Sequence, residues 1–422
     1  MRVRLAYGTE APEVEVPEDA TVVASGEQSV LADPSGAVRA SLAHPLAGPA
    51  LGDLVPRQGE VVVVFPDLTR PMPNTTVLPP LLAELERAGA GPERVQLLCA
   101  TGTHRQATPA EMAALVGPDI VGRYRIHDHD ADDGAHVPVG EVDGTPVLLE
   151  RRYVEAGMRI LTGFVEPHFF AGWSGGPKGT CPGLAATSTI LEAHSPERVA
   201  DPRSTWLVTE GNPVHDFVRA ATALCPPELS VDVTIDRQRR LTGVFTGPLP
   251  VGHRAAIAFA TDRVTRSVGG RFDVVVTTNG GHPLDRNLYQ AVKGMAAAER
   301  VVADGGIIVM AAACGDGVPG EGAFARILAA ASTPAELAGS GGPGQLDRWQ
   351  AQVLGRVLAR AEVWLYSQGI DDDAARSAQL VPVPDLAAAV ADAIARAPGR
   401  TGGPARVCVL PEGPLTVATP AG

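Results

Sequence analysis

Short runs of β-branched and aliphatic residues recur along the chain, and most end at a turn that contains Gly, Asp or Pro. These runs fall at 60–65 (EVVVVF), 95–100 (VQLLCA), 159–164 (RILTGF), 274–278 (VVVTT) and 306–310 (GIIVM). Apolar residues at helical spacing occur between them, as at 78–88 and 323–331. Strands that alternate with helices predict an α/β protein, with mixed or mostly parallel sheets flanked by helices.

A change of pattern near residues 254–270 indicates where the chain divides. A helix-like stretch, RAAIAFATDRVTRSVGG, precedes a new strand at 273–278. We therefore expect two domains, an N-terminal one over residues 1–266 and a C-terminal one over residues 267–403. Residues 404–422 contain one more short apolar run, and we expect this tail to return to the N-terminal domain.

Composition and charge narrow the class of protein. The chain has 422 residues, of which 45% are hydrophobic and 20% charged, a composition that favours a folded protein over a disordered one. Its net charge of -13 and the lack of any Lys/Arg-rich run argue against nucleic-acid binding and favour a small-molecule partner. No run of about 18 apolar residues and no hydrophobic signal core is visible, so we expect a cytoplasmic protein without membrane association. Five scattered cysteines without CxxC spacing predict neither a disulfide framework nor a cysteine zinc site.

Polar residues follow the first two strands directly, where open α/β sheets bind their ligands. The loop PDLTRPMPN carries Asp67, Thr69 and Arg70 between prolines, and a guanidinium held there suits a carboxylate or a phosphate. A helix start capped by Asp67 explains the same residues equally well. The loop ATGTHR places His104 where an acid/base would be expected, because imidazole has a pKa of about 6.5. An ordinary exposed histidine is the alternative.

The third loop, over residues 163–194, is the most informative. It contains six glycines and the side chains of His168, Lys178 and His194. Glycines such as Gly175 and Gly176 allow backbone N–H groups to approach an anion. A lysine in uncharged surroundings is a candidate nucleophile if it is desolvated. A plain surface loop is the alternative, but segments this long without a function are uncommon in compact domains.

Two further segments carry weaker signals. The loop NGGHPLDRNLYQAVK follows the strand at 274–278, and its Gln290 and Lys293 share one face of a predicted helix, where they could bind an anion. Exposed glutamine and lysine are common on helices, so this pattern alone decides little. The sequence HDHD at 127–130 could bind a divalent metal, but it continues into ADDGAH. We interpret that stretch as an acidic, solvated turn.

Taken together, the motifs resemble those of the nickel-pincer lactate racemase family. They are DLTRP from Asp67, TGTHR from Thr101, EPHFFAGWSGGPKGTCPGLA from Glu166, GNPVHDF from Gly211 and NGGHPLDRNLYQAVKGM from Asn279. The resemblance covers roughly residues 1–420. It implies two α/β domains with the active site in the cleft between them.

The resemblance also implies a cofactor and residue roles. The cofactor is a nickel-pincer nucleotide, a pyridinium-3,5-bisthiocarboxylic acid mononucleotide whose sulfur groups hold nickel. Lys178 matches the lysine that can be tethered to it, and His194 matches the histidine that ligates nickel. His104 and His168 match the two catalytic acid/bases. The remaining matches are Asp67, Thr69, Gly175 and Gly176 at the cofactor, and Arg70, Gln290, Lys293 and Trp349 at the substrate.

The implied reaction is inversion of C2 in a 2-hydroxy acid. Hydride passes to the cofactor and back while a histidine takes the hydroxyl proton, so two enantiomers require two histidines. Proteins that make the cofactor are implied as upstream partners, whereas the particular hydroxy acid and the oligomeric state do not follow from the sequence. Two alternatives stay open. One is a zinc hydrolase that uses His104, His168 and His194, although it lacks HExxH spacing; the other is a non-catalytic carrier of the cofactor.

Overall fold

The structure is a computed structural model that describes residues 1–422 except 25, 27–28, 321–322, 340–344, 398–402 and 422. It contains two compact units. The first unit comprises residues 27–194 and 201–262, and the second comprises residues 1–26, 195–200 and 263–422. The last crossing of the chain between the two units falls at residues 262–263.

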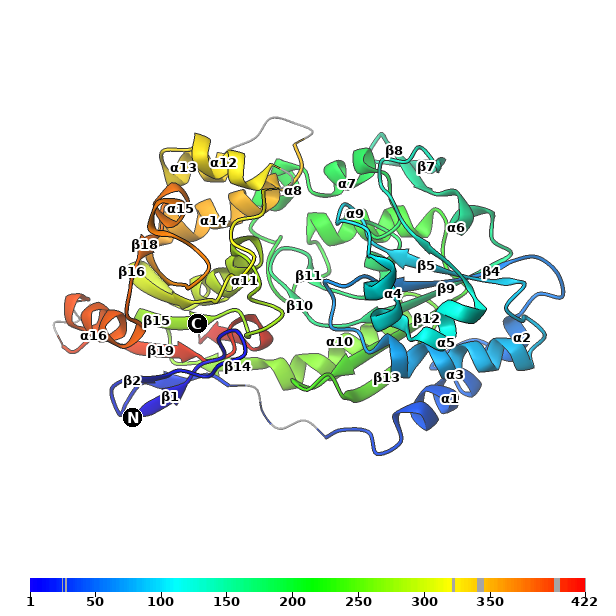
Figure 1. Ribbon diagram of the computed structural model, residues 1–422, viewed down its shortest axis with the longest axis horizontal. Coiled ribbons are helices and arrows are strands. Elements are labelled where there is room, and N and C mark those ends of the chain that lie inside the picture. Colours follow the sequence, from blue (N-terminus) through cyan, green and yellow to red (C-terminus); the bar gives the residue numbers. More distant parts are fainter. Residues whose placement is uncertain (25, 27–28, 321–322, 340–344, 398–402, 422) are drawn as a thin grey trace. The chain divides into compact units, whose positions relative to one another are not determined.

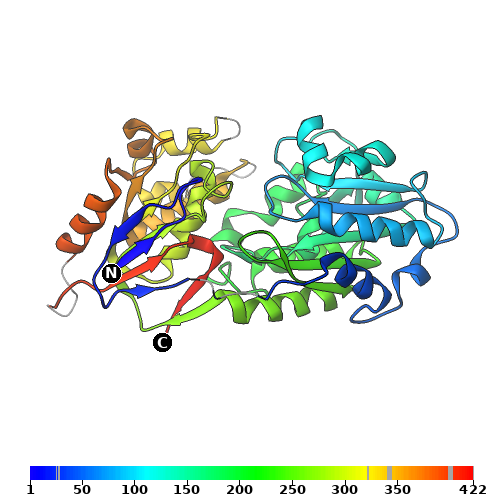
Figure 2. The ribbon, with the colours of Figure 1, turned by 60° about the horizontal axis from the view of Figure 1, so that its bottom comes forward.

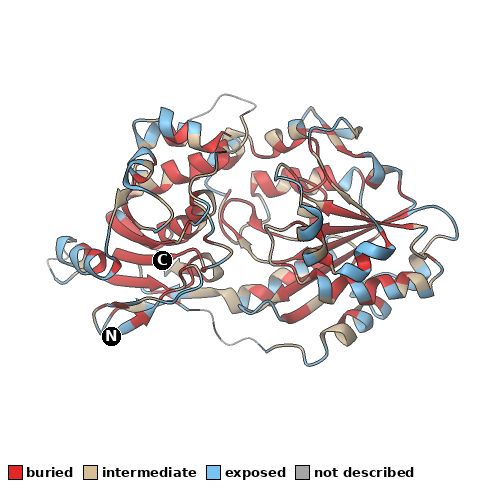
Figure 3. Cartoon of the chain, in the orientation of Figure 1, coloured by how far each residue is buried: buried red, intermediate tan, exposed pale blue. Residues whose placement is uncertain are grey.

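The first unit is built on a six-stranded sheet (Figure 1). Its strands, in spatial order, are β13 (Leu241–Gly247), β12 (Leu229–Ile235), β9 (Met158–Phe164), β4 (Val61–Pro66), β5 (Val95–Ala100) and β6 (Arg125–Asp128). All neighbours are parallel except β12 and β13, which are antiparallel. Central parallel strands are covered on both faces, which explains why β4 is an unbroken apolar run with its first five residues buried (Figure 3).

Helices cover this sheet. The helix α3 (Asn74–Arg87) places Val77, Leu81 and Leu85 on one side, spaced by four residues, and packs them in the same core as the strand residues Val61 and Val63. The other helices of this unit are α1 (Pro34–Ala43), α2 (Leu51–Leu54), α4 (Pro109–Val116), α5 (Pro118–Arg123), α6 (Arg151–Glu155), α7 (Thr187–Ala193), α9 (Pro213–Ala223) and most of α10 (Val251–Val264).

The second unit contains another six-stranded sheet, and all its neighbouring strands are parallel. In spatial order they are β18 (Val381–Pro382), β17 (Ala361–Tyr366), β16 (Val302–Ala311), β15 (Phe272–Thr278), β19 (Val407–Leu410) and β3 (Thr21–Val22). The helices of this unit are α8 (Pro196–Ala200), α11 (Leu288–Glu299), α12 (Phe324–Ala330), α13 (Pro334–Gly339), α14 (Arg348–Arg360), α15 (Asp372–Ser377) and α16 (Leu386–Arg396). Both units thus confirm the predicted α/β class.

The two ends of the chain depart from the expected domain plan. The tail and residues 1–26 both belong to the second unit, where β19 lies between β15 and β3 in the sheet. Likewise, β20 (Val417–Pro420) pairs with β14 (Thr265–Val268). Figure 2 shows the N-terminal strands beside the C-terminal ones. The edge of β15 needs hydrogen-bond partners, and β19, whose four residues are all buried, supplies them.

Short two-stranded elements complete the fold. They are β1 (Arg2–Arg4) with β2 (Glu13–Glu15), β7 (His136–Val142) with β8 (Thr145–Glu150), and β10 (Pro167–His168) with β11 (Gly172–Trp173). Asp143 and Gly144 join β7 to β8 with positive φ angles of 51° and 78°, as a two-residue hairpin turn requires. All five cysteines are buried and free. Across the described ranges, no helix combines the length and apolarity needed to cross a membrane.

Candidate active site

Three of the predicted loops begin side by side. The strands β4, β5 and β9 are adjacent and parallel, so their carboxyl ends lie at one edge of the sheet. Pro66 is in register with Ala100, which places the loop after β4 next to the loop after β5. This edge is where an open α/β sheet binds ligands.

A carboxylate supports the first candidate base. The Asp67 Oδ2 atom lies 2.8 Å from His104 Nδ1, and the Thr69 hydroxyl donates to Asp67 Oδ1 over 2.8 Å. Because a carboxylate only accepts hydrogen bonds, His104 Nδ1 carries the proton that it donates, and the neutral ring has its lone pair on Nε2. Arg70 donates to the Thr69 hydroxyl at 3.4 Å. The arrangement resembles the aspartate–histidine pair of a general base.

The Asp67 carboxyl stays ionised despite its burial. Burial acts to raise its pKa, but the charge of His104 and the hydrogen bond from it, the charge of Arg70 and the hydrogen bond from Thr69 outweigh that effect. The net result is a pKa below the ordinary value of 3.8. Asp67 is thus a permanent anion behind an imidazole that is 38% exposed, a position suited to stabilising the protonated ring.

Backbone contacts join the His104 loop to the third loop. Gly102, with a φ of +59°, donates its N–H to the Gly183 carbonyl at 3.0 Å. Gly183 in turn donates to the Lys178 carbonyl at 3.1 Å. A Cβ atom on Gly183 would lie 2.8 Å from the Ala100 side chain, so this approach requires glycine.

The second candidate acid/base, His168, has the opposite proton arrangement. It ends β10, is buried, and its Nδ1 accepts the N–H of Ala171 at 3.2 Å. An accepting Nδ1 means that the neutral ring carries its proton on Nε2. His104 in its neutral form thus offers a lone pair at Nε2, whereas His168 offers an N–H.

Phe170 brings three predicted residues together. Its ring centroid lies 4.6 Å from that of His168 and 5.4 Å from that of His194, both edge-to-face. The Lys178 ammonium nitrogen lies 6.0 Å from the same centroid. The sequence analysis did not single out Phe170, although it stands inside the motif EPHFFAG, two residues after His168.

His194 has the properties of a metal ligand. It caps the C-terminus of α7, and its Nδ1 contacts the Ile190 carbonyl at 2.8 Å. A carbonyl only accepts, so Nδ1 carries the proton and Nε2 the lone pair. Burial, and then the positive charge of Lys178, lower the pKa of His194 from 6.5 to about 3. The ring is therefore neutral at physiological pH, the state in which imidazole binds metals.

The glycines before Lys178 serve close packing more clearly than anion binding. Gly176 donates its N–H to Asp232 Oδ1 at 2.8 Å, so that amide has a hydrogen-bond partner within the protein. A Cβ atom on Gly176 would lie 2.5 Å from the His253 ring, and one on Gly175 would lie 2.8 Å from Val165. The carboxylate of Asp232 is fully buried in β12 and also accepts the Ser230 hydroxyl.

The motif GNPVHDF holds the loop that carries His168. The Asn212 side chain donates to the carbonyls of Phe170 and Val208 at 2.9 and 3.0 Å, and it caps α9 through the N–H groups of Val214 and His215. His215 Nδ1 contacts the Ala171 carbonyl at 3.2 Å. These contacts give a structural reason for a motif to which the sequence had assigned no role.

The remaining predicted residues belong to the second unit. Gln290 and Lys293 lie on α11 and are half-buried, and their separation by three residues puts them on one face. Trp349 is the second residue of α14 and is buried, with its indole N–H donating to the Tyr289 hydroxyl at 2.9 Å. Their roles at a substrate stay predictions.

The stretch 127–130 was predicted to be an acidic, solvated turn, but part of it lies inside the protein. His129 is buried, and Asp128 accepts hydrogen bonds from the Thr101 hydroxyl and from the N–H of Ala107. Strand β6 ends here against β5, which draws these side chains inward. In the part of the chain that the structure describes, the group of potential metal ligands that lie together is His129, His136 and Glu150. It includes none of the three histidines of the zinc hydrolase alternative.

Comparisons with known proteins agree on one family. Residues 7–206 match the family model of the lactate racemase N-terminal domain, and residues 269–418 match that of the C-terminal domain. A lactate racemase from Lactiplantibacillus plantarum is 33% identical over 383 residues, which cover 89% of each chain. One from Thermoanaerobacterium thermosaccharolyticum is 32% identical over 383 residues, 89% of this chain and 88% of that relative.

Solved structures lead to the same family. The lactate racemase apoprotein from Thermoanaerobacterium thermosaccharolyticum superimposes with a TM-score of 0.90 at 30% identity, over 99% of this chain and 100% of the other. A Thermotoga maritima protein shares the fold, with a TM-score of 0.70 at 17% identity over 94% of this chain and all of its own. The matches to both domains and the identities along most of the length show that the chain belongs to the lactate racemase family and is an isomerase.

Proposed function

We propose that this enzyme inverts the C2 centre of a 2-hydroxy acid, and lactate is the first substrate to test because both similar enzymes are named lactate racemases. The observation that carries the proposal is the gathering of His168, Lys178 and His194 around Phe170. They lie in the loop that follows β9, and β9 is in the same sheet as β4 and β5, which lead into the loops of Asp67 and His104. Two imidazoles and an amine at the ligand-binding edge of a sheet suit proton transfer on both faces of a small acid.

The two histidines have complementary starting states for this reaction. His104 Nε2 has a lone pair that takes the hydroxyl proton of one enantiomer, and the Asp67 carboxylate stabilises the imidazolium that results. His168 returns a proton to the carbonyl oxygen of the 2-keto acid from the other side as the imidazolium, so that loss of the Nε2 proton leaves a neutral ring. This state requires Nδ1 to take up a proton and to give up its contact with the Ala171 N–H. After one inversion both rings have changed protonation state, so each histidine is base for one enantiomer and acid for the other.

Lys178 and His194 fit a nickel-bearing cofactor. A neutral, buried imidazole with its lone pair on Nε2 suits nickel, and a lysine whose charge reaches that imidazole can hold a carboxylate or thiocarboxylate group or form a covalent tether. When bound, the nickel-pincer nucleotide would supply the hydride acceptor that lets the α-hydrogen leave without a carbanion. The apolar ring of Phe170 between the two residues excludes water from this position.

Substrate binding is assigned to cationic and amide side chains. Arg70, which follows Asp67 and Thr69 in the loop after β4, is a fork for the substrate carboxylate. Gln290 and Lys293 on α11, with Trp349 on α14, are proposed as substrate-binding residues of the second unit. When the substrate carboxylate is held by such groups, the rest of the 2-keto acid can rotate and present the other face of C2.

The decisive experiment uses holoenzyme made in a host that contains the cofactor pathway. Chiral chromatography follows racemisation of lactate, malate and longer aliphatic or aromatic 2-hydroxy acids. We expect interconversion of at least one pair together with stoichiometric nickel and a visible chromophore. Colourless, nickel-free and inactive protein from that host would contradict the proposal.

The lysine tether can be tested cleanly because the sequence contains only two lysines, Lys178 and Lys293. We expect the intact mass of the holoenzyme to include an adduct that Lys178→Ala loses and that Lys293→Arg, the matched control, retains. His104→Asn and His168→Asn separate the enzyme from a non-catalytic carrier. Both variants should keep the nickel and lose racemisation, whereas unchanged turnover in either would remove that histidine from the mechanism.

A further inference from the structure

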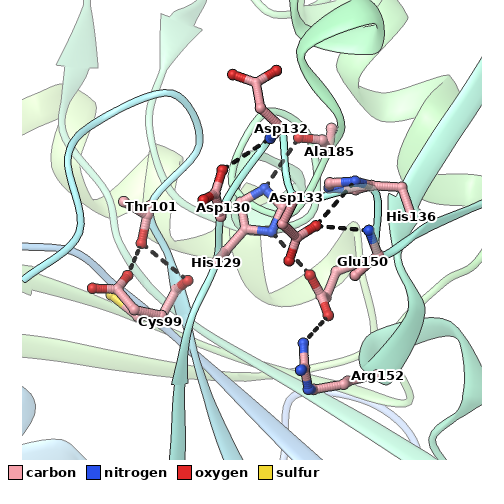
Figure 4. Close-up of polar contacts among 12 residues, drawn as sticks. Cys99, Thr101, His129, Asp130, Asp132, Asp133, His136, Glu150, Arg152 and Ala185 are labelled. Carbon is pink, nitrogen blue, oxygen red and sulfur yellow. Dashed lines mark hydrogen bonds and ion pairs between the residues drawn. The ribbon is translucent and has the colours of Figure 1, made fainter.

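A compact group of potential metal ligands stands apart from the proposed catalytic residues. It consists of His129, His136 and Glu150, and one ligand atom from each lies within 4.8 Å of the others (Figure 4). The side chains are almost fully enclosed, with exposed fractions of 0%, 5% and 1%. We call this group the His–His–Glu cluster.

The strand register builds the cluster. His136 opens β7 and Glu150 closes β8, and the two residues are direct partners across the antiparallel hairpin. His129 comes immediately after β6, and its Nδ1 lies 3.2 Å from Glu150 Oε2. The tight turn at Asp143 and Gly144, together with a register shift between Pro138 and Gly140, sets this pairing, so the hairpin positions two ligands and the end of β6 positions the third.

Both ring nitrogens of His129 face oxygen acceptors, so a neutral ring leaves one of these contacts without a proton. Its Nε2 lies 3.1 Å from the Ala185 carbonyl, an acceptor, so Nε2 carries a proton. Its Nδ1 then faces a carboxylate oxygen, a second acceptor. Two lone pairs 3.2 Å apart in a buried site repel each other unless a second proton or a cation lies between them.

His136 distinguishes these two possibilities. Its Nε2 is buried and has no hydrogen-bond partner. Its other nitrogen, Nδ1, faces the Asp133 carboxylate at 3.7 Å, which favours the proton on Nδ1 and the lone pair on Nε2. A doubly protonated His129 would donate to Glu150 but would leave His136 Nε2 without a partner. A metal cation could instead be bound by His129, His136 and Glu150 together.

We propose that the His–His–Glu cluster binds a divalent transition metal, with zinc as the expected ion. Two neutral imidazoles and one carboxylate are a known zinc ligand set. Ligand atoms around tetrahedral zinc are roughly 3.4 Å apart, so small side-chain rotations from the present spacing complete the site. Each histidine also has an acceptor near its other nitrogen, as is typical of metal-bound histidine, whose free N–H usually donates to a carbonyl or a carboxylate.

The enclosure of the cluster favours a structural role, in which the metal braces the third loop. Ala185, whose carbonyl accepts the hydrogen bond from His129 Nε2, lies between Lys178 and His194 in sequence. The next residues are tied to the same elements, because Ala186 donates to the Leu148 carbonyl and Thr187 to the Ala131 carbonyl. A metal that locks His129 to the hairpin would therefore hold the start of α7, the helix that His194 caps.

The test adds zinc to the full-length chain and needs no racemase activity. The protein is made without the cofactor pathway, stripped with a chelator, and analysed for bound metal after dialysis against zinc. We compare the wild type with His136→Gln, with His127→Gln as a matched control two residues before His129, and with His194→Gln to exclude the proposed nickel ligand. We expect one zinc per chain in the wild type and both controls, and at least about tenfold weaker binding in His136→Gln.

Thermal unfolding supplies an independent measurement. At saturating zinc we expect the unfolding temperature of the wild type to rise by about 5 °C, and that of His136→Gln to stay unchanged. Wild-type protein that retains no more zinc than His136→Gln and does not respond to zinc would overturn the proposal. If His136→Gln fails to fold, cobalt titration of the wild type decides instead. Intense visible bands of tetrahedral Co²⁺ support the site, and their absence overturns it.

Discussion

The substitution Asp67→Asn tests how the first base is prepared. In the wild type the Thr69 hydroxyl donates to Asp67 Oδ1, while Oδ2 faces His104 Nδ1 at 2.8 Å. An asparagine keeps its oxygen toward Thr69, because that hydroxyl needs an acceptor, and so turns its NH2 group toward His104. The Nδ1 atom must then accept, and the proton moves to Nε2. The variant thus holds His104 in the tautomer that cannot take a proton from the substrate.

The expected loss follows from the role of the pair. Removing a positioned general base costs about 10² to 10⁴ in rate, which corresponds to roughly 3 to 5 kcal/mol of transition-state stabilisation. The carboxylate also stabilises the imidazolium, so its loss adds to the effect of the wrong tautomer. Because Asp67 is proposed to act through His104, we expect kcat to fall much more than KM changes. For a pair of enantiomers the equilibrium constant is one, so kcat/KM falls equally in both directions.

The assay is chiral chromatography of lactate starting from each pure enantiomer, with nickel content measured for every preparation. Asp128→Asn is the matched control, because Asp128 is a carboxylate at the same sheet edge that contacts Thr101 and Ala107. We expect the control to retain activity within about threefold per nickel, as is usual for a residue outside the chemistry. Wild-type turnover in nickel-loaded Asp67→Asn would refute the assignment of Asp67 and His104 as a catalytic pair.

Three further predictions concern the loop that follows β9. His168→Gln should lower kcat/KM by about 10² or more while the Lys178 adduct persists in the intact mass, and loss of the adduct would instead assign His168 a structural role. Asp232→Asn should lower the free energy of unfolding by about 1 to 3 kcal/mol in urea titrations, because the buried carboxylate holds the Gly176 N–H; an unchanged midpoint would contradict this. His194 has its pKa lowered from 6.5 to about 3, so the unfolded chain takes up the proton first and stability falls as the pH drops from 6.5 toward 3. His194→Gln should lose less stability than the wild type between pH 7 and 5, and equal losses would show that His194 does not contribute.

Local sequence was enough to predict the strands and the loops that matter. The run EVVVVF predicts a buried strand because every residue of a central parallel strand faces a covered surface, and β4 occupies Val61–Pro66. The polar residues placed directly after such runs, Asp67 and His104 among them, lie at the sheet edge where the fold binds ligands. Motif resemblance added the family, which the comparisons confirm.

Long-range pairing was beyond the reach of local patterns. β19 pairs with β15 across more than a hundred residues of sequence, and no local periodicity records which strand will fill an open sheet edge. For the same reason the sequence does not explain why Asp232 stands within an apolar strand. The folded structure does, because the Asp232 carboxylate accepts the Gly176 N–H. The His–His–Glu cluster likewise exists because hairpin register sets Glu150 opposite His136 and near His129.

The proton positions at the site also depend on the folded structure. The contact that sets the His168 tautomer is local, because Ala171 is three residues further along the chain, whereas the contact that sets the His104 tautomer comes from Asp67, 37 residues earlier. The Asp67 carboxylate accepts a hydrogen bond from His104 Nδ1, whereas the Ala171 N–H donates one to His168 Nδ1. The sequence therefore determines the chemical groups and the strands that carry them. The tertiary structure decides which nitrogen holds each proton, through the folded loop at His168 and the pairing of β4 with β5 at His104, because a tautomer follows its nearest partner in space.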